Sequence, residues 1–346
     1  DPQRINEDIP EIDNEIKMRI IKRCNIGKLK ISMIKKKLPN VAVLGAGRMG
    51  VAIALIFARS GHDVRLYEPN PSALGAANGR LRELAALLNC LDAIHIPISD
   101  ELNKVVGQAH LVIEAAPENT AIKRDLFIEL SGVVGPDVIV CTNTSSLPIE
   151  SFTQGFLNPE RLVYTHFWNP PYAIRLVEIA PGLDSDKLAM DTVAVWLKGA
   201  EMAPVLLQQA VPGLIGNRLQ HALKREAIAL IAGGVCDAAT IDDVVKFGFG
   251  ARMAVLGPME QSDLVGLDMT LAIHDSLMPV LDRTAGAHPY LIDKVDKGEL
   301  GMDAGTGFRT WTPATAKAVR DRLDHWNTQM SPTEGETKPH KREENI

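Results

Sequence analysis

The sequence predicts an α/β protein: a doubly wound, mainly parallel sheet in the first part of the chain and a smaller all-helical domain after it. Three observations lead to this prediction. Short apolar runs alternate with helical patterns up to about residue 210. A glycine-rich turn follows the first of these runs. Beyond Pro212 the apolar residues recur only at helical spacing.

The apolar runs give the order of elements in the first part. Segments with amphipathic helical spacing lie between them, as at residues 49–60 and 123–130. Strands that alternate with helices indicate βαβ units, and strands buried on both faces read as continuous apolar runs. We therefore expect a parallel sheet built from six such runs, at residues 41–44, 64–67, 111–115, 138–141, 162–165 and 177–179.

The second part and the two ends follow from the same pattern. We expect linked helices over residues 214–231, 241–247, 264–280 and 289–295. The residues at 1–37 are rich in Lys and Arg and predict a disordered or added extension. The last residues combine Pro, Glu, Lys and Thr, a composition typical of disorder. The predicted divisions are an extension at 1–37, an α/β domain at 38–211, a helical domain at 212–326 and a tail at 327–346.

The composition narrows the class of partner. The formal net charge is -6, and no basic stripe runs through the body of the chain, so a nucleic-acid partner is not expected. No apolar run is long enough to cross a membrane. The cysteines form no CxxC pair, which argues against a disulfide framework and against a metal site. We expect a cytoplasmic protein with a small-molecule substrate; the four cysteines are Cys24, Cys90, Cys141 and Cys236.

Residues 45–50, with the sequence GAGRMG, lie between the first expected strand and the helix after it. In such a turn Gly45 permits the tight bend, Gly47 lets the backbone approach a pyrophosphate, and Gly50 allows close packing of helix and strand. Glu68 ends the next strand, where a carboxylate can accept hydrogen bonds from a ribose 2′-hydroxyl. This context predicts a Rossmann-type domain that binds NAD. Arg48 and Arg65, which lie nearby, leave NADP open.

A lone histidine, His166, follows the apolar run at 162–165, and Glu178 lies at the next one. Doubly wound sheets bind ligands beyond the carboxyl ends of their strands, so His166 is well placed for chemistry. Oxidising an alcohol with a nicotinamide needs a base near neutral pH, and a carboxylate can orient that base. The alternative is a hydrogen-bonded core histidine with Glu178 only at the end of the sheet.

Together these motifs resemble the 3-hydroxyacyl-CoA dehydrogenase family in order and in spacing. The resemblance implies an NAD-dependent dehydrogenase with its site between the two domains. It implies that His166 is the catalytic histidine and that Glu178 is its acidic partner. The motifs that carry it are the glycine turn and residues 113–119, 142–147, 165–178, 212–219, 257–260 and 305–311.

The resemblance also assigns the remaining site residues. It implies that Ser145 and Asn217 position the substrate oxygen near His166. Taken alone, Ser145 could instead be a helix N-cap, and Lys123 could be a solvated surface residue. The cofactor-binding positions implied by the motifs are Gly45, Gly47, Arg48, Met49, Gly50, Glu68, Ala115, Glu118, Lys123 and Asn143.

The chain departs from the acyl-CoA enzymes of the family between Glu68 and Leu111. Those enzymes carry a longer, lysine-rich helical segment there, whereas the bases of this segment are Arg80, Arg82 and Lys104. A CoA headgroup carries several negative charges that need such bases. The short segment therefore favours a small carboxylate-bearing substrate, either a free 3-hydroxy acid or a pyridine carboxylate aldehyde.

Three alternatives to a small-substrate dehydrogenase remain open, and a partner subunit is also expected. The chain could be a true 3-hydroxyacyl-CoA dehydrogenase. It could instead be a non-catalytic, crystallin-like NAD-binding protein, although that class would have lost the base. The basic extension at 1–37 could dock another macromolecule. The family resemblance implies a homodimer through the helical domain. Arg175, Arg218 and Arg252 are candidates for holding a substrate carboxylate.

Overall fold

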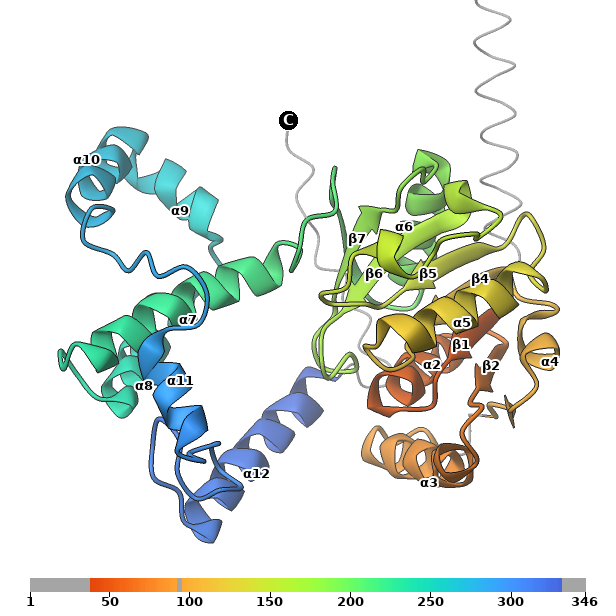
Figure 1. Cartoon of the computed structure of the whole chain (residues 1–346), viewed down its shortest axis with the longest axis horizontal. Coiled ribbons are helices and arrows are strands. Elements are labelled where there is room, and N and C mark those ends of the chain that lie inside the picture. Colours follow the sequence, from red (N-terminus) through yellow and green to blue (C-terminus); the bar gives the residue numbers. More distant parts are fainter. Residues whose placement is uncertain (1–37, 92–94, 332–346) are drawn as a thin grey trace, which may run out of the picture. The chain divides into compact units, whose positions relative to one another are not determined.

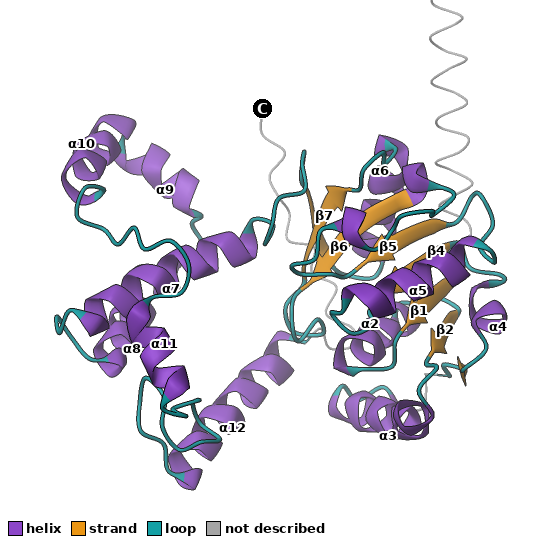
Figure 2. Ribbon diagram, viewed as in Figure 1, coloured by secondary structure: helices purple, strands orange, loops and turns teal. Residues whose placement is uncertain are grey.

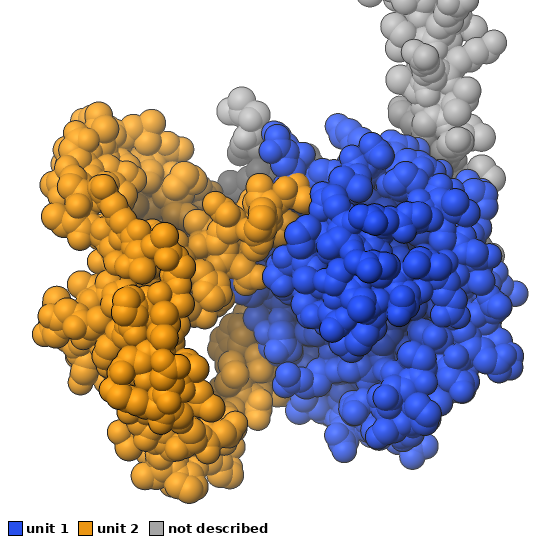
Figure 3. All heavy atoms as spheres, in the orientation of Figure 1, with its two compact units in different colours: residues 1–209 blue, residues 210–346 orange. Residues whose placement is uncertain are grey.

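The computed structural model describes residues 38–91 and 95–331. The chain divides into two compact units, residues 1–209 and residues 210–346 (Figures 1 and 3). Unit 1 contains a sheet flanked by helices, and the described part of unit 2 is built of helices (Figure 2). The expected fold class, a mainly parallel α/β sheet followed by a helical domain, is confirmed. The predicted extension at 1–37 lies outside the described residues.

The sheet of unit 1 has the strand order β3-β2-β1-β4-β5-β6-β7-β8. Neighbouring strands are parallel except β6 and β7, which are antiparallel. The order reverses at β1, which has β2 on one side and β4 on the other; doubly wound sheets bind ligands at such a point. The strands are β1 (Val41–Leu44), β2 (Val64–Tyr67), β3 (Ile98–Ser99), β4 (Leu111–Glu114), β5 (Ile139–Thr142), β6 (Leu162–Phe167), β7 (Leu176–Pro181) and β8 (Ala203–Leu206).

Two of these strands are not predicted by the apolar runs. The strand β3 has only two residues, too few for a periodic signal. The edge strand β8 contains Pro204 and is largely exposed. A proline argues against a central strand, so the sequence of this segment does not predict one. The other six match the expected runs to within two residues at each end.

Three helices of unit 1 begin at side chains that accept hydrogen bonds from their first turns. Asn70 caps α3, Asn119 caps α5, and Asp186 caps α6. Such caps satisfy backbone N–H groups that have no partner within the helix. The helices are α2 (Arg48–Arg59), α3 (Pro71–Leu87), α4 (Leu102–Val106), α5 (Thr120–Ser131) and α6 (Lys187–Gly199).

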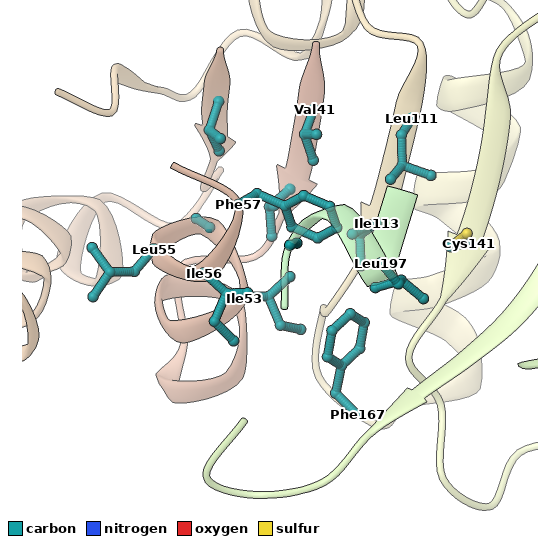
Figure 4. Packing of buried hydrophobic residues seen from close by; sticks show 14 of the residues in the cluster. Val41, Ile53, Leu55, Ile56, Phe57, Leu111, Ile113, Cys141, Phe167 and Leu197 are labelled. Atoms are coloured by element: carbon teal, nitrogen blue, oxygen red, sulfur yellow. The ribbon is translucent and has the colours of Figure 1, made fainter. Parts of the chain in front are cut away.

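The core of unit 1 lies where α2 and α6 pack on the central strands. Residues 50–57 of α2 are all buried, and Ile53 and Phe57 belong to one cluster with Val41 and Ile113 (Figure 4). Leu197 of α6 joins the same cluster. Burying each such side chain contributes about 1.5–3 kcal/mol. This packing fixes α2, and therefore the turn before it, on the sheet.

Unit 2 shows two differences from the predicted helices. The single helix expected at 264–280 is wrong, because Gly266 has a φ of 97° and separates α9 from α10. The helix α12 runs to Met330 and buries Asn327, so residues 327–330 are helical and do not belong to a disordered tail. The tail at 332–346 lies outside the described residues. The helices are α7 (Gly216–Ala232), α8 (Ala238–Phe247), α9 (Pro258–Val265), α10 (Leu267–Leu277), α11 (Pro289–Asp296) and α12 (Pro313–Met330).

Candidate functional site

The glycine turn between β1 and α2 has the geometry that dinucleotide binding requires. Gly45 has a φ of 106°, and a Cβ there would lie 2.6 Å from the carbonyl oxygen of Ala115. A Cβ on Gly50 would overlap the carbonyl oxygen of Gly45. A Cβ on Gly47 would meet no atom within 4 Å, so its backbone borders open space. The turn is therefore closed toward the protein and open beside the helix N-terminus, where a pyrophosphate binds.

Glu68, directly after β2, lies against this turn. Its Oε2 accepts a hydrogen bond from the backbone N–H of Ala46 at 2.8 Å, and its Oε1 accepts one from Asn70 N at 3.1 Å. Arg80 of α3 donates to the carbonyl oxygen of Ala46 at 2.9 Å. The carboxylate is thus held at the end of β2 beside the pyrophosphate turn, the expected place for a group that binds ribose hydroxyls.

The other residues expected around the turn have separate places. Arg48 is the first residue of α2 and its side chain is exposed. Met49 packs against the hydrophobic core. Ala115 follows β4 and donates its N–H to Leu44 O at 2.8 Å, which holds the loop after β4 beside the end of β1.

His166 and Glu178 face each other across the antiparallel pair β6 and β7, in direct register. His166 Nδ1 lies 3.0 Å from Glu178 Oε2, and the two residues are only 5% and 2% exposed. An ionised carboxylate can only accept, so Nδ1 carries a proton and Nε2 is the accepting nitrogen of the neutral ring. The carboxylate thereby fixes both the tautomer and the ring orientation.

Ser145 lies at the other nitrogen of this histidine. Its Oγ is 3.2 Å from His166 Nε2. No helix starts at Ser145, which lies in a bend between β5 and the short 3₁₀ helix Ile149–Ser151, so the N-cap alternative does not apply. The hydroxyl and the imidazole therefore converge at the carboxyl end of the sheet, where a substrate hydroxyl can reach both.

Glu118, in the loop before α5, holds the segment that carries Ser145. Its Oε1 accepts hydrogen bonds from Thr144 Oγ1 at 2.6 Å and from the backbone N–H groups of Ser145 and Ser146 at 3.0 Å each. Burial alone would raise the pKa of Glu118, but the Thr144 hydroxyl, Lys123 and these backbone N–H groups hold its pKa below the usual value. The carboxylate therefore stays charged and anchors the segment.

Lys123 is buried, which rules out the solvated-surface alternative. Its Nζ lies 2.6 Å from Glu114 Oε1 and 3.4 Å from Glu118 Oε2. Glu114, at the end of β4, also accepts from Thr142 Oγ1 of β5 at 2.7 Å and from Ala116 N at 2.7 Å. The lysine side chain thus joins α5 to the end of β4 and to the loop after it, and Glu114 and Glu118 in turn bind Thr142 and Thr144 on the β5 side.

Asn143 joins two strands at the same edge of the sheet. Its Oδ1 accepts a hydrogen bond from the backbone N–H of Phe167 at 2.9 Å, so the residue ties the end of β5 to the end of β6. Asn217 is the second residue of α7 and partly buried in unit 2. Of the four residues expected to act in catalysis, unit 1 brings together His166, Glu178 and Ser145.

Three polar residues near the site are absent from the expected set. Glu114 ends an apolar strand, and Lys123 follows it nine residues later, a pair that the sequence pattern does not single out. Thr144 donates to Glu118, and Trp168 donates its indole N–H to Glu178 Oε2 at 3.3 Å. The sequence held one signal for these contacts. Glu114 is an acid at the end of an apolar strand, and a buried charge needs a partner.

Residues 38–91 and 95–331 offer neither a metal-binding cluster nor a membrane-spanning helix. These residues hold no group of three or more His, Cys, Asp and Glu side chains that could bind a metal ion. No helix in this part of the chain is long and apolar enough to cross a membrane.

Two family models match the chain. Residues 40–210 match the NAD-binding domain of 3-hydroxyacyl-CoA dehydrogenase, and residues 213–311 match its C-terminal domain. The chain belongs to the 3-hydroxyacyl-CoA dehydrogenase family. It is an NAD-dependent oxidoreductase, and the open glycine turn and the carboxylate of Glu68 fit that cofactor.

Several relatives are about a third identical to this chain over the aligned residues. The chain is 32% identical over 289 residues to 5-formyl-3-hydroxy-2-methylpyridine 4-carboxylate 5-dehydrogenase of Mesorhizobium japonicum, covering 81% of this chain and 93% of the relative. It is 32% identical to 3-hydroxybutyryl-CoA dehydrogenase of Clostridioides difficile, covering 78% and 98%. It is 34% identical to L-carnitine dehydrogenase of Streptomyces griseus, covering 65% and 69%.

Solved structures show the same fold. The crystal structure of a 5-formyl-3-hydroxy-2-methylpyridine 4-carboxylic acid 5-dehydrogenase, described as an NAD⁺-dependent dismutase, superposes with a TM-score of 0.78 at 31% identity. It covers 85% of this chain and 97% of that one. The 3-hydroxybutyryl-CoA dehydrogenase of Escherichia coli has a TM-score of 0.63 at 30% identity, covering 80% and 60%.

Proposed function

We propose that this dehydrogenase oxidises a hydroxyl, or a hydrated aldehyde, of a small carboxylate-bearing substrate, with His166 as general base. The observation that carries the proposal is the hydrogen-bonded series Ser145 Oγ, His166 Nε2, His166 Nδ1 and Glu178 Oε2, with separations of 3.2 and 3.0 Å. It supplies an oriented base whose accepting nitrogen faces the end of the sheet that binds ligands.

In the oxidation, the substrate C–H and O–H bonds break and a carbonyl forms; the hydride would pass to the nicotinamide and the proton to His166. When bound, NAD supplies the hydride acceptor at its nicotinamide. His166 Nε2 takes the hydroxyl proton, and the buried Glu178 carboxylate stabilises the imidazolium that results. Ser145 holds the substrate oxygen by its hydroxyl. The reverse reduction uses the same groups in the opposite sense.

The segment between β2 and β4 supports a small substrate. Of its three bases, Arg80 is already engaged with the carbonyl oxygen of Ala46 and Lys104 forms an exposed ion pair with Glu101, which leaves Arg82, exposed on α3. A CoA headgroup would need free bases for its phosphates. The similarity to 5-formyl-3-hydroxy-2-methylpyridine 4-carboxylate 5-dehydrogenase supports the same conclusion. Candidate substrates are that aldehyde and a free 3-hydroxy acid.

The second candidate function is 3-hydroxybutyryl-CoA dehydrogenase, which the C. difficile relative favours. The two candidates differ in one measurement. Rates of NADH oxidation or formation are compared with acetoacetyl-CoA, with free 3-hydroxy acids, and with the pyridine aldehyde. Efficient turnover of acetoacetyl-CoA alone would overturn the small-substrate proposal.

The base is tested by His166→Asn, which keeps a polar side chain of similar reach but cannot take up a proton. Turnover should fall by about 10²- to 10⁴-fold, while NADH binding, followed by fluorescence titration, persists. A variant that keeps wild-type turnover would remove His166 from the mechanism. Asn217, which the family resemblance implies at the substrate, is tested in parallel by Asn217→Ala, with a loss of turnover expected.

We also propose that the protein is a homodimer through unit 2. The helices α9 and α10 carry large apolar side chains on open surface, including Leu264, Leu267 and Leu271, which are 73%, 63% and 62% exposed. Large apolar side chains exposed together on neighbouring helices are normally covered by a partner. Most soluble oligomers are symmetric assemblies of one chain, and two-fold dimers are the commonest of them, so we propose a second copy of this chain as the partner.

A further inference from the structure

One oxygen of Glu178 accepts two N–H groups. His166 Nδ1 lies 3.0 Å from Glu178 Oε2, and the indole Nε1 of Trp168 lies 3.3 Å from the same atom. The two rings meet edge to face, with centroids 5.9 Å apart and an interplanar angle of 62°. Trp168 follows β6 directly and is partly buried.

The shared acceptor has an electrostatic consequence. The indole N–H can only donate, so its hydrogen bond favours the ionised carboxylate. Part of the charge of Oε2 is then engaged by the indole, which leaves less of it to stabilise a proton on the imidazole. Two donors on one oxygen also restrict the rotation of the carboxylate, and therefore of the ring that it holds.

We propose that Trp168 is a positioning residue that tunes the proton affinity of the His166 base through Glu178. The indole restrains how strongly Glu178 stabilises the imidazolium, so that the base is neutral and ready to accept a proton at lower pH than the His–Glu pair alone would allow. This inference rests on the proposed function, in which His166 is the general base.

The other ionisable groups on β5, on β6 and in the loop before α5 do not carry this effect. Cys141 on β5 and Tyr164 on β6 stay neutral, because burial raises the pKa of each to about 12. Glu118 is charged, but it reaches the ring only through Ser145, whose backbone it binds. Glu178 on β7 is therefore the carboxylate in direct contact with His166.

The sharpest test replaces Trp168 with β-(3-benzothienyl)alanine, which keeps the shape of the bicyclic ring but has sulfur in place of the N–H. Trp168→Phe is the genetically encoded version. The matched control is the same pair of replacements at Trp196 of α6, which packs against the core of the same unit. The readout is an NMR titration of the His166 ring, assigned by its loss in His166→Asn.

We expect the midpoint of the His166 titration to move to higher pH by about 0.5 unit in both Trp168 variants and not in the Trp196 controls. The acidic limb of kcat/KM against pH should move in the same direction, with KM unchanged. An unchanged midpoint in the benzothienyl protein would overturn the proposal. Because the NMR titration needs no substrate, a shifted midpoint without turnover would refute the proposed function and leave the Trp168–Glu178–His166 coupling established.

Discussion

Lys123 Nζ lies 2.6 Å from Glu114 Oε1, and the two side chains are only 1% and 0% exposed. The pair joins α5 to the end of β4, and Thr142 of β5 donates to the other oxygen of the same glutamate. Removing two charges from water is costly, and the cost is offset only where both ions are well hydrogen-bonded. These hydrogen bonds meet that requirement at the base of the two loops that carry Glu118 and Ser145.

The variant Lys123→Met should destabilise the protein by about 3–5 kcal/mol, because it leaves the Glu114 carboxylate buried without its partner. The double variant with Glu114→Gln should recover part of this loss. The measurement is urea unfolding followed by circular dichroism. Lys104→Met, which breaks an exposed pair with Glu101, is the control and should change little. Equal unfolding midpoints for Lys123→Met and wild type would contradict the prediction.

The Ser145 hydroxyl should matter to turnover and its neighbour should not. Ser145→Ala removes the oxygen 3.2 Å from His166 Nε2 but keeps the backbone N–H that Glu118 holds. We expect kcat to fall about 10- to 100-fold. Ser146→Ala is the matched control, because its hydroxyl binds Glu118 at 3.2 Å and makes no hydrogen bond to the histidine. Similar losses of kcat in both variants would show that turnover depends on the structure of the loop and not on the Ser145 hydroxyl.

Glu68 should set the preference for NAD over NADP. The variant Glu68→Ser removes the carboxylate beside the glycine turn, and with it the repulsion of a 2′-phosphate. The KM for NAD should rise by about 10-fold or more, while the KM for NADP rises less or falls. The control is Glu83→Ser, an exposed change on α3. A loss of affinity equal for both cofactors would show that the carboxylate only supports the turn.

His62 should make stability depend on pH. Burial lowers its pKa from 6.5, partly offset by the hydrogen bond of Nδ1 to Pro39 O at 3.0 Å; its ring packs edge to face on Phe57. Since the folded state binds its proton less readily than the unfolded state, this stability is complete above pH 6.5. It is lost as the pH falls through the lowered pKa. His62→Gln should flatten the change of Tm between pH 7.5 and about 5.5.

The matched control for this measurement is His325→Gln, an exposed change on α12. It should leave the slope of Tm against pH as in the wild type. A slope that is the same in all three proteins would mean that the His62 ring is protonated as easily in the folded chain as in the unfolded one.

The apolar surface of α9 and α10 should hold two copies together. Leu267→Glu combined with Leu271→Glu places two charges on it and should give monomers in analytical ultracentrifugation, with the helical content unchanged. Leu188→Glu is the control, a residue 60% exposed on α6 of unit 1. A wild-type protein that sediments as a monomer at micromolar concentration would exclude the dimer.

The sheet was largely predictable because its strands are buried on both faces and therefore read as continuous apolar runs. The order of the strands was not, since nothing local specifies that β6 and β7 are antiparallel while their neighbours are parallel. The break at Gly266 was hidden because the apolar spacing continues through it. A positive φ at one glycine overrides a pattern that only counts side chains.

The candidate site, like the sheet, has one part that the sequence predicts and another part that it does not. The glycine turn and the His166 stretch are local in sequence, so their spacing carries information. Glu114, Thr144 and Trp168 act through contacts with side chains of other elements, and their residue types are common in other roles. Lys123 illustrates the difficulty: at the start of a helix a lysine is usually solvated, and only the buried end of β4 makes it a structural ion.

The antiparallel register of β6 and β7 limits how the candidate site of this chain can change over evolution. A shift of one residue in that pairing would turn Glu178 to the opposite face of the sheet and away from His166. The rest of the connection between the two strands, residues 169–175, is under no such restriction so long as the register is kept and Trp168 still reaches Glu178. Changes confined to this connection therefore leave the His166–Glu178 pair in place.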